Sequence, residues 1–209
     1  MRKPILSICL FLITMQLHAQ IQKGWYAEDF VTVGNSWYTH YDNSFHFHLQ
    51  TGANLIYQFN KTIGLGSGLA FSTEGNTHKY ASITSNTKVV QRNNYVRVPV
   101  FARVVLNSEG KTIPYFDGGF SMGFLVSGKQ KFYADDELKS NEKNTPINKN
   151  DVGLLANLGV AHQLHPKLFL KGYATYYRGF VQQEALDGGN GPTITNSHAG
   201  IGIGLCYRL

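Results

Sequence analysis

Three histidines are the residues of this sequence best suited to hold a metal ion. His46 and His48 stand two residues apart in a segment of alternating apolar and polar residues, and His198 begins another such segment. Alternate residues of a strand project to one face, so we expect these imidazoles, which are ligands for zinc and copper, to converge. No CxxC pair or helical HxxxH accompanies them. We therefore predict hydrogen-bonded histidines near a mouth of the fold and no metal; a pH-sensitive mouth is the alternative.

Charged residues of both signs recur on the same polar faces as these histidines. They are Arg97, Arg103, Asp117, Asp151 and Lys171. An unpaired ion in a narrow, partly dry interior costs far more free energy than a paired one. These residues are thus expected to form an internal network of salt bridges with a structural role. A conducting polar path is the alternative interpretation.

The sequence contains no motif that predicts catalysis or cofactor binding. It has no G-x-S-x-G nucleophile turn and no glycine-rich phosphate loop followed by a helix. The run 200–204 has glycine at every second position, which is typical of one face of a strand. We predict no enzyme activity, no catalytic residue and no cofactor.

The composition indicates that strands position these side chains. The chain has 209 residues and a formal net charge of +6, and only 15% of its residues are charged, against about 25% in soluble domains. Its 22 glycines, 12 tyrosines and 13 phenylalanines favour sheets over helical bundles and disorder. The small positive excess, without a basic cluster or an aromatic recognition motif, argues against a nucleic-acid partner.

Seven segments alternate with a period of two residues, which predicts long amphipathic strands: 45–59, 63–72, 95–106, 116–127, 151–160, 168–176 and 198–209. A strand around 30–38 completes eight, although its alternation is poor. Short links at 60–61, 107–111 and 165–167 separate longer polar segments at 73–88, 130–149 and 182–195, which we expect to be loops. This plan is typical of an eight-stranded antiparallel up-and-down transmembrane β-barrel with short periplasmic turns and longer outer loops.

The first twenty residues resemble an export signal that is cleaved. Arg2 and Lys3 precede an apolar run, and Ala19 stands where a signal peptidase would cut. We predict a signal peptide over 1–20 and one barrel domain over 21–209. Cys9 lies inside the signal, so the remaining Cys206 cannot form an internal disulfide.

The apolar faces of the strands are expected to point outward, into lipid. Eight strands enclose only enough room for side chains, and the bulky Phe, Leu, Ile, Val and Tyr residues would overpack it. Glycine suits a crowded lumen, and an apolar outer face suits hydrocarbon, where a closed barrel leaves no unpaired sheet edge. The interior is therefore predicted to contain glycines and paired charges.

Four segments resemble those of the PorT-like outer-membrane β-barrel proteins of Bacteroidetes, a resemblance that implies a barrel in the outer membrane and no catalytic residue. The segments are Tyr95-Val96-Arg97-Val98-Pro99-Val100, Asp117-Gly118-Gly119-Phe120-Ser121-Met122-Gly123, Asp151-Val152-Gly153-Leu154-Leu155-Ala156-Asn157-Leu158-Gly159 and Tyr176-Tyr177-Arg178-Gly179-Phe180. The end of the sequence, with Gly204, Tyr207 and Leu209, is similar to the signal read by the barrel-assembly machinery, except that Leu209 stands where Phe is usual.

The sequence thus predicts an outer-membrane barrel with a side-chain-plugged lumen and a structural or interaction role through its outer loops. Its expected partners are the lipid bilayer, the barrel-assembly machinery and a protein at the outer loops. Deleting residues 131–147 is expected to leave the barrel intact. Two alternatives stay open: a soluble periplasmic barrel that binds a small apolar ligand, and a narrow ion or water pore.

Overall fold

A computed structural model of the protein describes residues 21–39, 44–81, 86–108, 110–143, 148–184 and 194–209. The predicted signal peptide, 1–20, lies outside these residues. The described residues form nine strands: β1 (Gly24–Tyr38), β2 (Phe47–Gln58), β3 (Ile63–Ala81), β4 (Asn86–Val105), β5 (Thr112–Ala134), β6 (Glu137–Lys143), β7 (Asn150–His165), β8 (Leu168–Glu184) and β9 (Ile194–Arg208).

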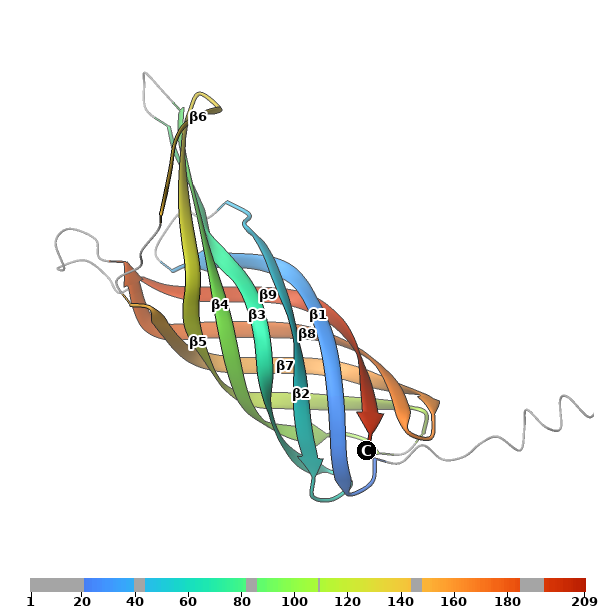
Figure 1. Ribbon diagram of the computed structural model, residues 1–209. Coiled ribbons are helices and arrows are strands. Elements are labelled where there is room, and N and C mark those ends of the chain that lie inside the picture. The colour runs from blue at the N-terminus through green and yellow to red at the C-terminus, as the bar shows by residue number, and fades with distance from the viewer. Residues whose placement is uncertain (1–20, 40–43, 82–85, 109, 144–147, 185–193) are drawn as a thin grey trace, which may run out of the picture.

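Eight of these strands close into a ring (Figure 1), which confirms the predicted all-β, eight-stranded antiparallel fold. The order around the ring is β1-β2-β3-β4-β5-β7-β8-β9, and β9 pairs with β1. Every neighbouring pair is antiparallel. Closure provides backbone partners along both edges of each strand, as hydrocarbon surroundings require. Within the described part of the chain, no helix has the length and apolar character needed to cross a membrane.

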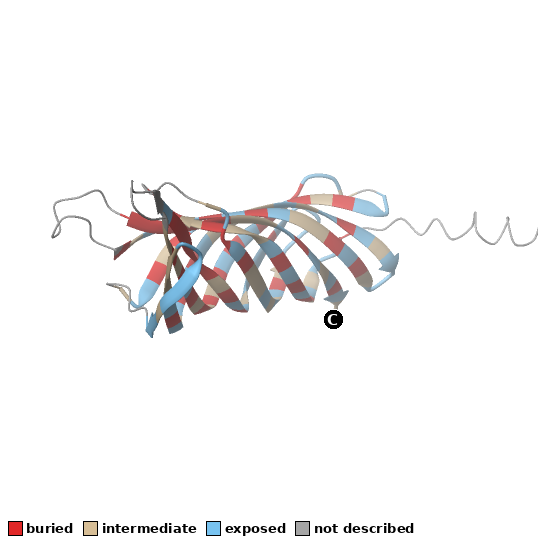
Figure 2. Cartoon of the chain, turned by 90° about the horizontal axis from the view of Figure 1, so that it is seen from above, coloured by how far each residue is buried: buried red, intermediate tan, exposed pale blue. Residues whose placement is uncertain are grey.

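The side chains follow the predicted two-residue period around the barrel (Figure 2), and the apolar set faces outward. Phe47, Leu154 and Ile203 are 49%, 47% and 67% exposed, whereas the residues directly before and after each of them are buried or half-buried. The bulky apolar side chains therefore cannot form a ligand-binding interior, which argues against the soluble-barrel alternative. The rings of Trp25 and Tyr57 pack against each other on the outer surface near the short-turn end, with their centres 4.9 Å apart and their planes tilted by 57°. Aromatic girdles lie at such positions.

The expected positions of the three long loops are wrong in part, because the strands continue well into them. β3 runs to Ala81 and β4 begins at Asn86, inside the segment 73–88. β5 and β6 occupy much of 130–149, and β8 and β9 reach into 182–195. β1 also begins at Gly24, before the predicted 30–38. The missed parts at the long-loop end are mostly polar, because they rise beyond the apolar belt and lose the alternation that marks the parts below. The missed start of β1 lies at the short-turn end and contains Trp25 and Tyr26.

An extended hairpin stands on the outer end of the barrel. β4 pairs with β5 as far as the Thr87–Ala134 pair, and β6 pairs with the upper part of β5. Figure 1 shows these strands extending beyond the other long-loop ends, with β6 at the tip. We call β6 and the parts of β3, β4 and β5 at this outer end the outer projection (residues 75–81, 86–94, 127–134 and 137–143).

Candidate functional site

The interior of the barrel is the candidate functional site, and its polar residues form two separate clusters. The upper cluster lies toward the long-loop end and contains His48, Glu74, Arg97, Asp151, Tyr177, Asn196 and His198. The lower cluster lies toward the short turns and contains Glu28, Arg103, Asp117, Asn157 and Lys171. Each cluster connects strands from opposite walls of the ring.

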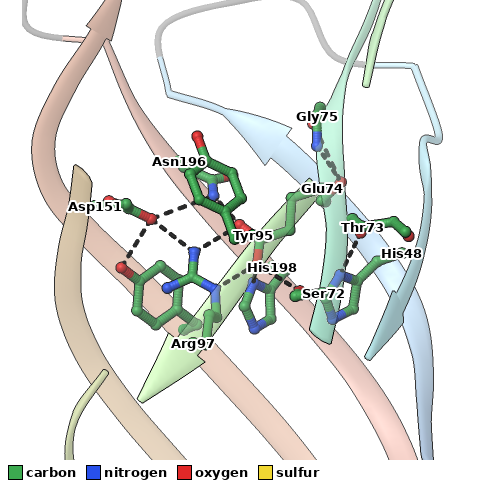
Figure 3. Close-up of polar contacts among 12 residues, drawn as sticks. His48, Ser72, Thr73, Glu74, Gly75, Tyr95, Arg97, Asp151, Asn196 and His198 are labelled. Carbon is green, nitrogen blue, oxygen red and sulfur yellow. Dashed lines mark hydrogen bonds and ion pairs between the residues drawn. The ribbon is translucent and has the colours of Figure 1, made fainter. Parts of the chain in front are cut away.

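In the upper cluster, Arg97 of β4 bridges two carboxylates from different walls (Figure 3). Its Nε and Nη2 atoms donate to the two oxygens of Glu74 on β3, at 2.5 and 2.6 Å, and Nη2 also donates to Asp151 Oδ2 on β7 at 2.7 Å. The Tyr177 hydroxyl donates to the same Asp151 oxygen at 2.9 Å. All four side chains are buried. A buried charged group is tolerable only with such partners, so these contacts tie four strands, β3, β4, β7 and β8, together across the lumen.

A stack of flat side chains continues from Arg97 across the lumen. The Arg97 guanidinium carbon lies 4.2 Å from the centre of the Tyr177 ring, Tyr177 stacks on His198 at 4.9 Å, and His198 stacks on His48 at 4.1 Å. The two imidazoles are nearly parallel, at 17°. His48 Nδ1 donates to the carbonyl oxygen of Thr73 at 2.9 Å, since a carbonyl can only accept.

The upper cluster includes a possible metal-ligand trio that the sequence did not indicate. Ligand atoms of His48, Glu74 and His198 lie within 4.8 Å of one another. The contacts oppose a metal, because both oxygens of Glu74 already accept hydrogen bonds from Ser72, Arg97 and Asn196. The positive guanidinium is also adjacent, and ring nitrogens of parallel stacked imidazoles do not converge on one ion. The arrangement suits side-chain packing better than ligation.

The lower cluster balances two carboxylates with two cations. Arg103 of β4 binds Asp117 through Nε and Nη2 at 2.7 and 2.9 Å, and its Nη1 binds Glu28 of β1 at 2.5 Å. Lys171 of β8 donates to the other Glu28 oxygen at 2.5 Å. Tyr115 lies beneath both cations, at 4.3 Å from the Arg103 guanidinium carbon and 5.2 Å from Lys171 Nζ. Four strands are thereby joined through one charge-matched group.

Below the lower cluster, the short-turn end of the lumen contains a group of buried, mostly apolar side chains. They are Ile21, Tyr26, Ile56, Phe101, Val105, Ile113, Tyr115, Ala161, Phe169 and Cys206. The described residues line two small interior cavities, among others, one of about 30 Å³ near the middle and one of about 20 Å³ beside this apolar group. A space of this size holds one or two water molecules.

The five charges singled out from the sequence all lie inside the barrel, but they divide between the two clusters. Arg97 and Asp151 meet in the upper one, whereas Arg103 and Asp117 meet in the lower one. Lys171 joins the lower cluster through Glu28 and not through a predicted partner. Glu28 and Glu74 were missed. The sequence signal for Glu74 is that it continues the every-second-residue series of small residues that runs from Gly64 to Ser72. The poor alternation of the first strand gives no such signal for Glu28.

The three histidines do not converge as a group. His48 and His198 stack, but His46 contacts Thr77 Oγ1 at 3.0 Å, and its backbone N–H donates to Asn35 Oδ1 at 2.8 Å. The residues of the predicted assembly signal lie at the end of β9 beside β1. There Tyr207 pairs with Ala27 and the Leu209 N–H donates to the Trp25 carbonyl oxygen at 3.0 Å. Both side chains are exposed, and Gly204 lies against the β1 backbone at Asp29.

Comparison with known proteins places the chain in a family. Among curated proteins, none matches. Neisserial surface protein A has a similar structure, with a TM-score of 0.53 and 13% identity over 89% of this chain and 97% of that chain. The outer membrane protein OprG from Pseudomonas aeruginosa gives 0.45 and 13% over 91% and 98%. At such low identity the likeness to the first supports the fold alone.

The sequence model of one family covers most of the chain. Residues 18–182 match the model described as outer membrane protein beta-barrel domain. A closed antiparallel ring with an apolar outer face agrees with that match. The chain therefore belongs to the outer membrane protein beta-barrel domain family, and its place is the outer membrane of the cell.

Proposed function

We propose that this protein is a structural or interaction barrel whose lumen is closed to solutes and whose partners bind at its outer end. The observation that supports this proposal is that buried side chains contact one another across the interior at three successive levels. The upper cluster, the lower cluster and the apolar group each span the interior, and the cavities left between them are only about 30 and 20 Å³. Eight-stranded barrels are narrow enough for side chains to fill them.

A conducting pore is the rival function, and planar-bilayer recording distinguishes the two. The proposal predicts no steady single-channel conductance from the folded protein. Arg103→Gln and Asp117→Asn are the informative variants, because both residues lie across the lumen in the lower cluster. A steady conductance of the unaltered protein that changes in size or ion selectivity in either variant would establish the pore and refute the closed lumen.

The buried thiol of Cys206 gives a second, independent measurement of closure. Cys206 is 5% exposed and belongs to the apolar group below the lower cluster. In a Cys9→Ser background, a membrane-impermeant maleimide is expected to label Cys206 only after unfolding. Asp135→Cys in a Cys9→Ser, Cys206→Ser background is the accessible control, since position 135 lies in an exposed turn. Labelling of folded Cys206 as fast as this control would contradict a closed lumen.

The remaining parts of the proposal concern export, assembly and the subfamily. We propose that residues 1–20 are removed on export and that Gly204, Tyr207 and Leu209 are read by the barrel-assembly machinery. The resemblance to PorT-like proteins supports this placement within the family. Tyr207→Ala is expected to slow assembly in cells, and Leu209→Phe to preserve or increase it. The heat-modifiable folded fraction of the membrane measures both, and equal fractions for the two variants would remove the assignment.

We also propose that the protein has no enzyme activity. Its buried charges are engaged with one another in the two clusters, and neither cavity admits more than water. A substrate would therefore need the clusters to separate. The interaction role is assigned to the outer projection, which extends beyond the long-loop ends of the other described strands (Figure 1).

A further inference from the structure

The outer face of the outer projection continues the lipid-facing surface of the barrel. Along β4, Val96 is on the lipid side, where its pairing partners Phe71 and Phe124 are 43% and 47% exposed. Side chains alternate along a strand, so Arg92 and Lys88 lie on this same side. Between them and below them, the residues that point the other way are buried: Tyr95, Asn93, Gln91 and Val89.

Cations are aligned across this face in register. Arg92 pairs directly with Lys129 on β5, and Lys129 pairs directly with Lys143 on β6. Lys88 pairs with Lys79 on β3 on one side and with Tyr133 on the other, and its Nζ lies 5.4 Å from the Tyr133 ring centre. Directly paired residues share a face. We call the resulting group the cationic face: Lys79, Lys88, Arg92, Lys129, Lys131 and Lys143.

The cationic face has no acidic complement among the described residues. None of its six members makes an ion pair with a described carboxylate, and Glu142 pairs with Gln130 on the opposite face. Asp135, Asp136 and Glu137 are confined to the tip, where Glu137 binds Lys139 at 2.7 Å. Like charges placed directly opposite one another destabilise a sheet. Counter-anions from outside the chain would relieve that repulsion.

The position of the cationic face selects the kind of anion. Arg92 stands four positions from Val96, which places it about 13 Å farther along the strand toward the long-loop end. The distance along the membrane normal is smaller because the strand is tilted. Immediately below the cations, Phe71, Phe124 and Val126 are 43%, 47% and 61% exposed. An anionic lipid could contact the apolar side chains with its acyl chains and the cations above them with its headgroup.

We propose that the cationic face binds the phosphate-bearing headgroups of the outer-leaflet lipids around the barrel. Arginine contacts phosphate through paired N–H donors, and lysine acts as a point charge. The cross-strand row of Arg92, Lys129 and Lys143 places three such groups beside one another. The projection would then be supported against the membrane surface. This inference rests on the membrane placement of the barrel and is independent of whether the lumen is closed.

The test compares lipid association of the reconstituted full chain by tryptophan quenching. Phe124→Trp, placed just below the cationic face, is the reporter in every protein, in a Trp25→Phe, Trp37→Phe background that removes the two native tryptophans. Vesicles of phosphatidylcholine contain either brominated phosphatidic acid or brominated phosphatidylcholine at the same mole fraction. The expected result is stronger quenching by the phosphatidic acid, a preference that high salt weakens by screening.

Two matched triple variants locate the effect. Arg92→Gln, Lys129→Gln, Lys143→Gln together are expected to reduce the preference at least about tenfold, because each cation near an anionic surface contributes severalfold. Lys23→Gln, Lys61→Gln, Lys111→Gln remove the same charge at the exposed short-turn end and are expected to keep it. Heat-modifiability on a gel verifies that both variants fold.

Three results would overturn the proposal. The first is equal quenching by both brominated lipids of the reporter protein whose cationic face is unaltered. The second is a preference retained after the three row residues are neutralised. The third is a preference abolished by inorganic phosphate at constant ionic strength, which would identify a soluble anion, and not a lipid headgroup, as the occupant.

Discussion

Arg97 is the side chain on which the upper cluster depends, because one guanidinium serves two buried carboxylates. Glu74 and Asp151 come from strands on different walls and both bind its nitrogens within 2.7 Å. Asn196 adds an amide donor to Glu74. An amide or imidazole stack can orient these carboxylates but does not supply the positive charge that buried ions need.

Arg97→Met is therefore expected to destabilise the barrel strongly. Removing one partner of a buried ion pair typically costs about 3–5 kcal/mol, because the remaining charge stays buried without compensation. The free energy of unfolding by urea in lipid vesicles measures the loss. Arg92→Met, an exposed substitution on the same strand, is the control and is expected to change stability by less than about 0.5 kcal/mol. Equal stabilities of the two variants would show that Arg97 is not a structural bridge.

At the same cluster, added Zn²⁺ is expected to leave the thermal unfolding midpoint unchanged. An ion that binds only the native state raises that midpoint by mass action, whereas Glu74 here is occupied by its own donors and the His48 and His198 rings are parallel. The midpoint is measured with the ion and with a chelator. A rise with zinc that disappears in His198→Gln would reveal a metal site and refute this expectation.

The β5–β6 hairpin of the outer projection is closed by a two-residue turn with a demanding backbone. Asp135 and Asp136 have φ values of 51° and 65°, and they stand between the end of β5 and the start of β6. Two successive residues with positive φ are typical of the type I′ hairpin turn, which favours Asn or Asp first and Gly second. The first position here matches that preference and the second does not.

Asp136→Gly is expected to stabilise the hairpin by about 1 kcal/mol, because glycine adopts the left-handed region without the steric cost borne by other residues. Amide hydrogen exchange of the β6 residues is the suitable measurement, since global unfolding need not report on the tip. Asp136→Ala removes the same charge and keeps the strain, so it is the matched control. Equal protection of β6 in both variants would mean that the turn geometry is not limiting.

The molecule as a whole consists of the eight-stranded ring and the outer projection, and the ring does not depend on the strand pairs that β6 makes. β5 pairs with β7 through Thr112–Phe124 and with β4 from Tyr115 to Ala134, whereas β6 pairs only with residues 129–134 of β5. Closure of the ring depends on the β1–β9 seam, where Tyr26 pairs with Arg208 and Tyr38 with Asn196. β6 is therefore the only part of the outer projection that is not a continuation of a ring strand, and the ring strands keep their own pairs below residue 127 of β5.

Deleting residues 131–147 is accordingly expected to leave a folded, heat-modifiable barrel. The reason is the pairing just described, and not the loop character first expected for this segment, since much of it forms the β5–β6 hairpin. The shift between boiled and unboiled samples on a gel measures folding. A matched deletion within β7, residues 152–158, breaks the ring and is the negative control. If the shorter projection also abolished the shift, the independence of ring and projection would be wrong.

The sequence by itself determined the local order of the molecule. A two-residue period fixes which side chains share a face, and the low charge content with many glycines indicates that the bulky face meets lipid; Phe47, Leu154 and Ile203 follow this rule. The number of strands in the ring follows as well, because each crossing must be long enough to span the hydrocarbon.

Only the tertiary structure decided which charges meet. Alternation assigns Arg97, Arg103 and Lys171 to the interior, but their partners depend on how the closed ring aligns distant strands. Glu28 and Glu74 lie 143 residues from Lys171 and 23 from Arg97, respectively. The outer projection was hidden for a related reason: strands beyond the bilayer need no apolar face, so polar pairing with neighbours, and not the sequence period, maintains them.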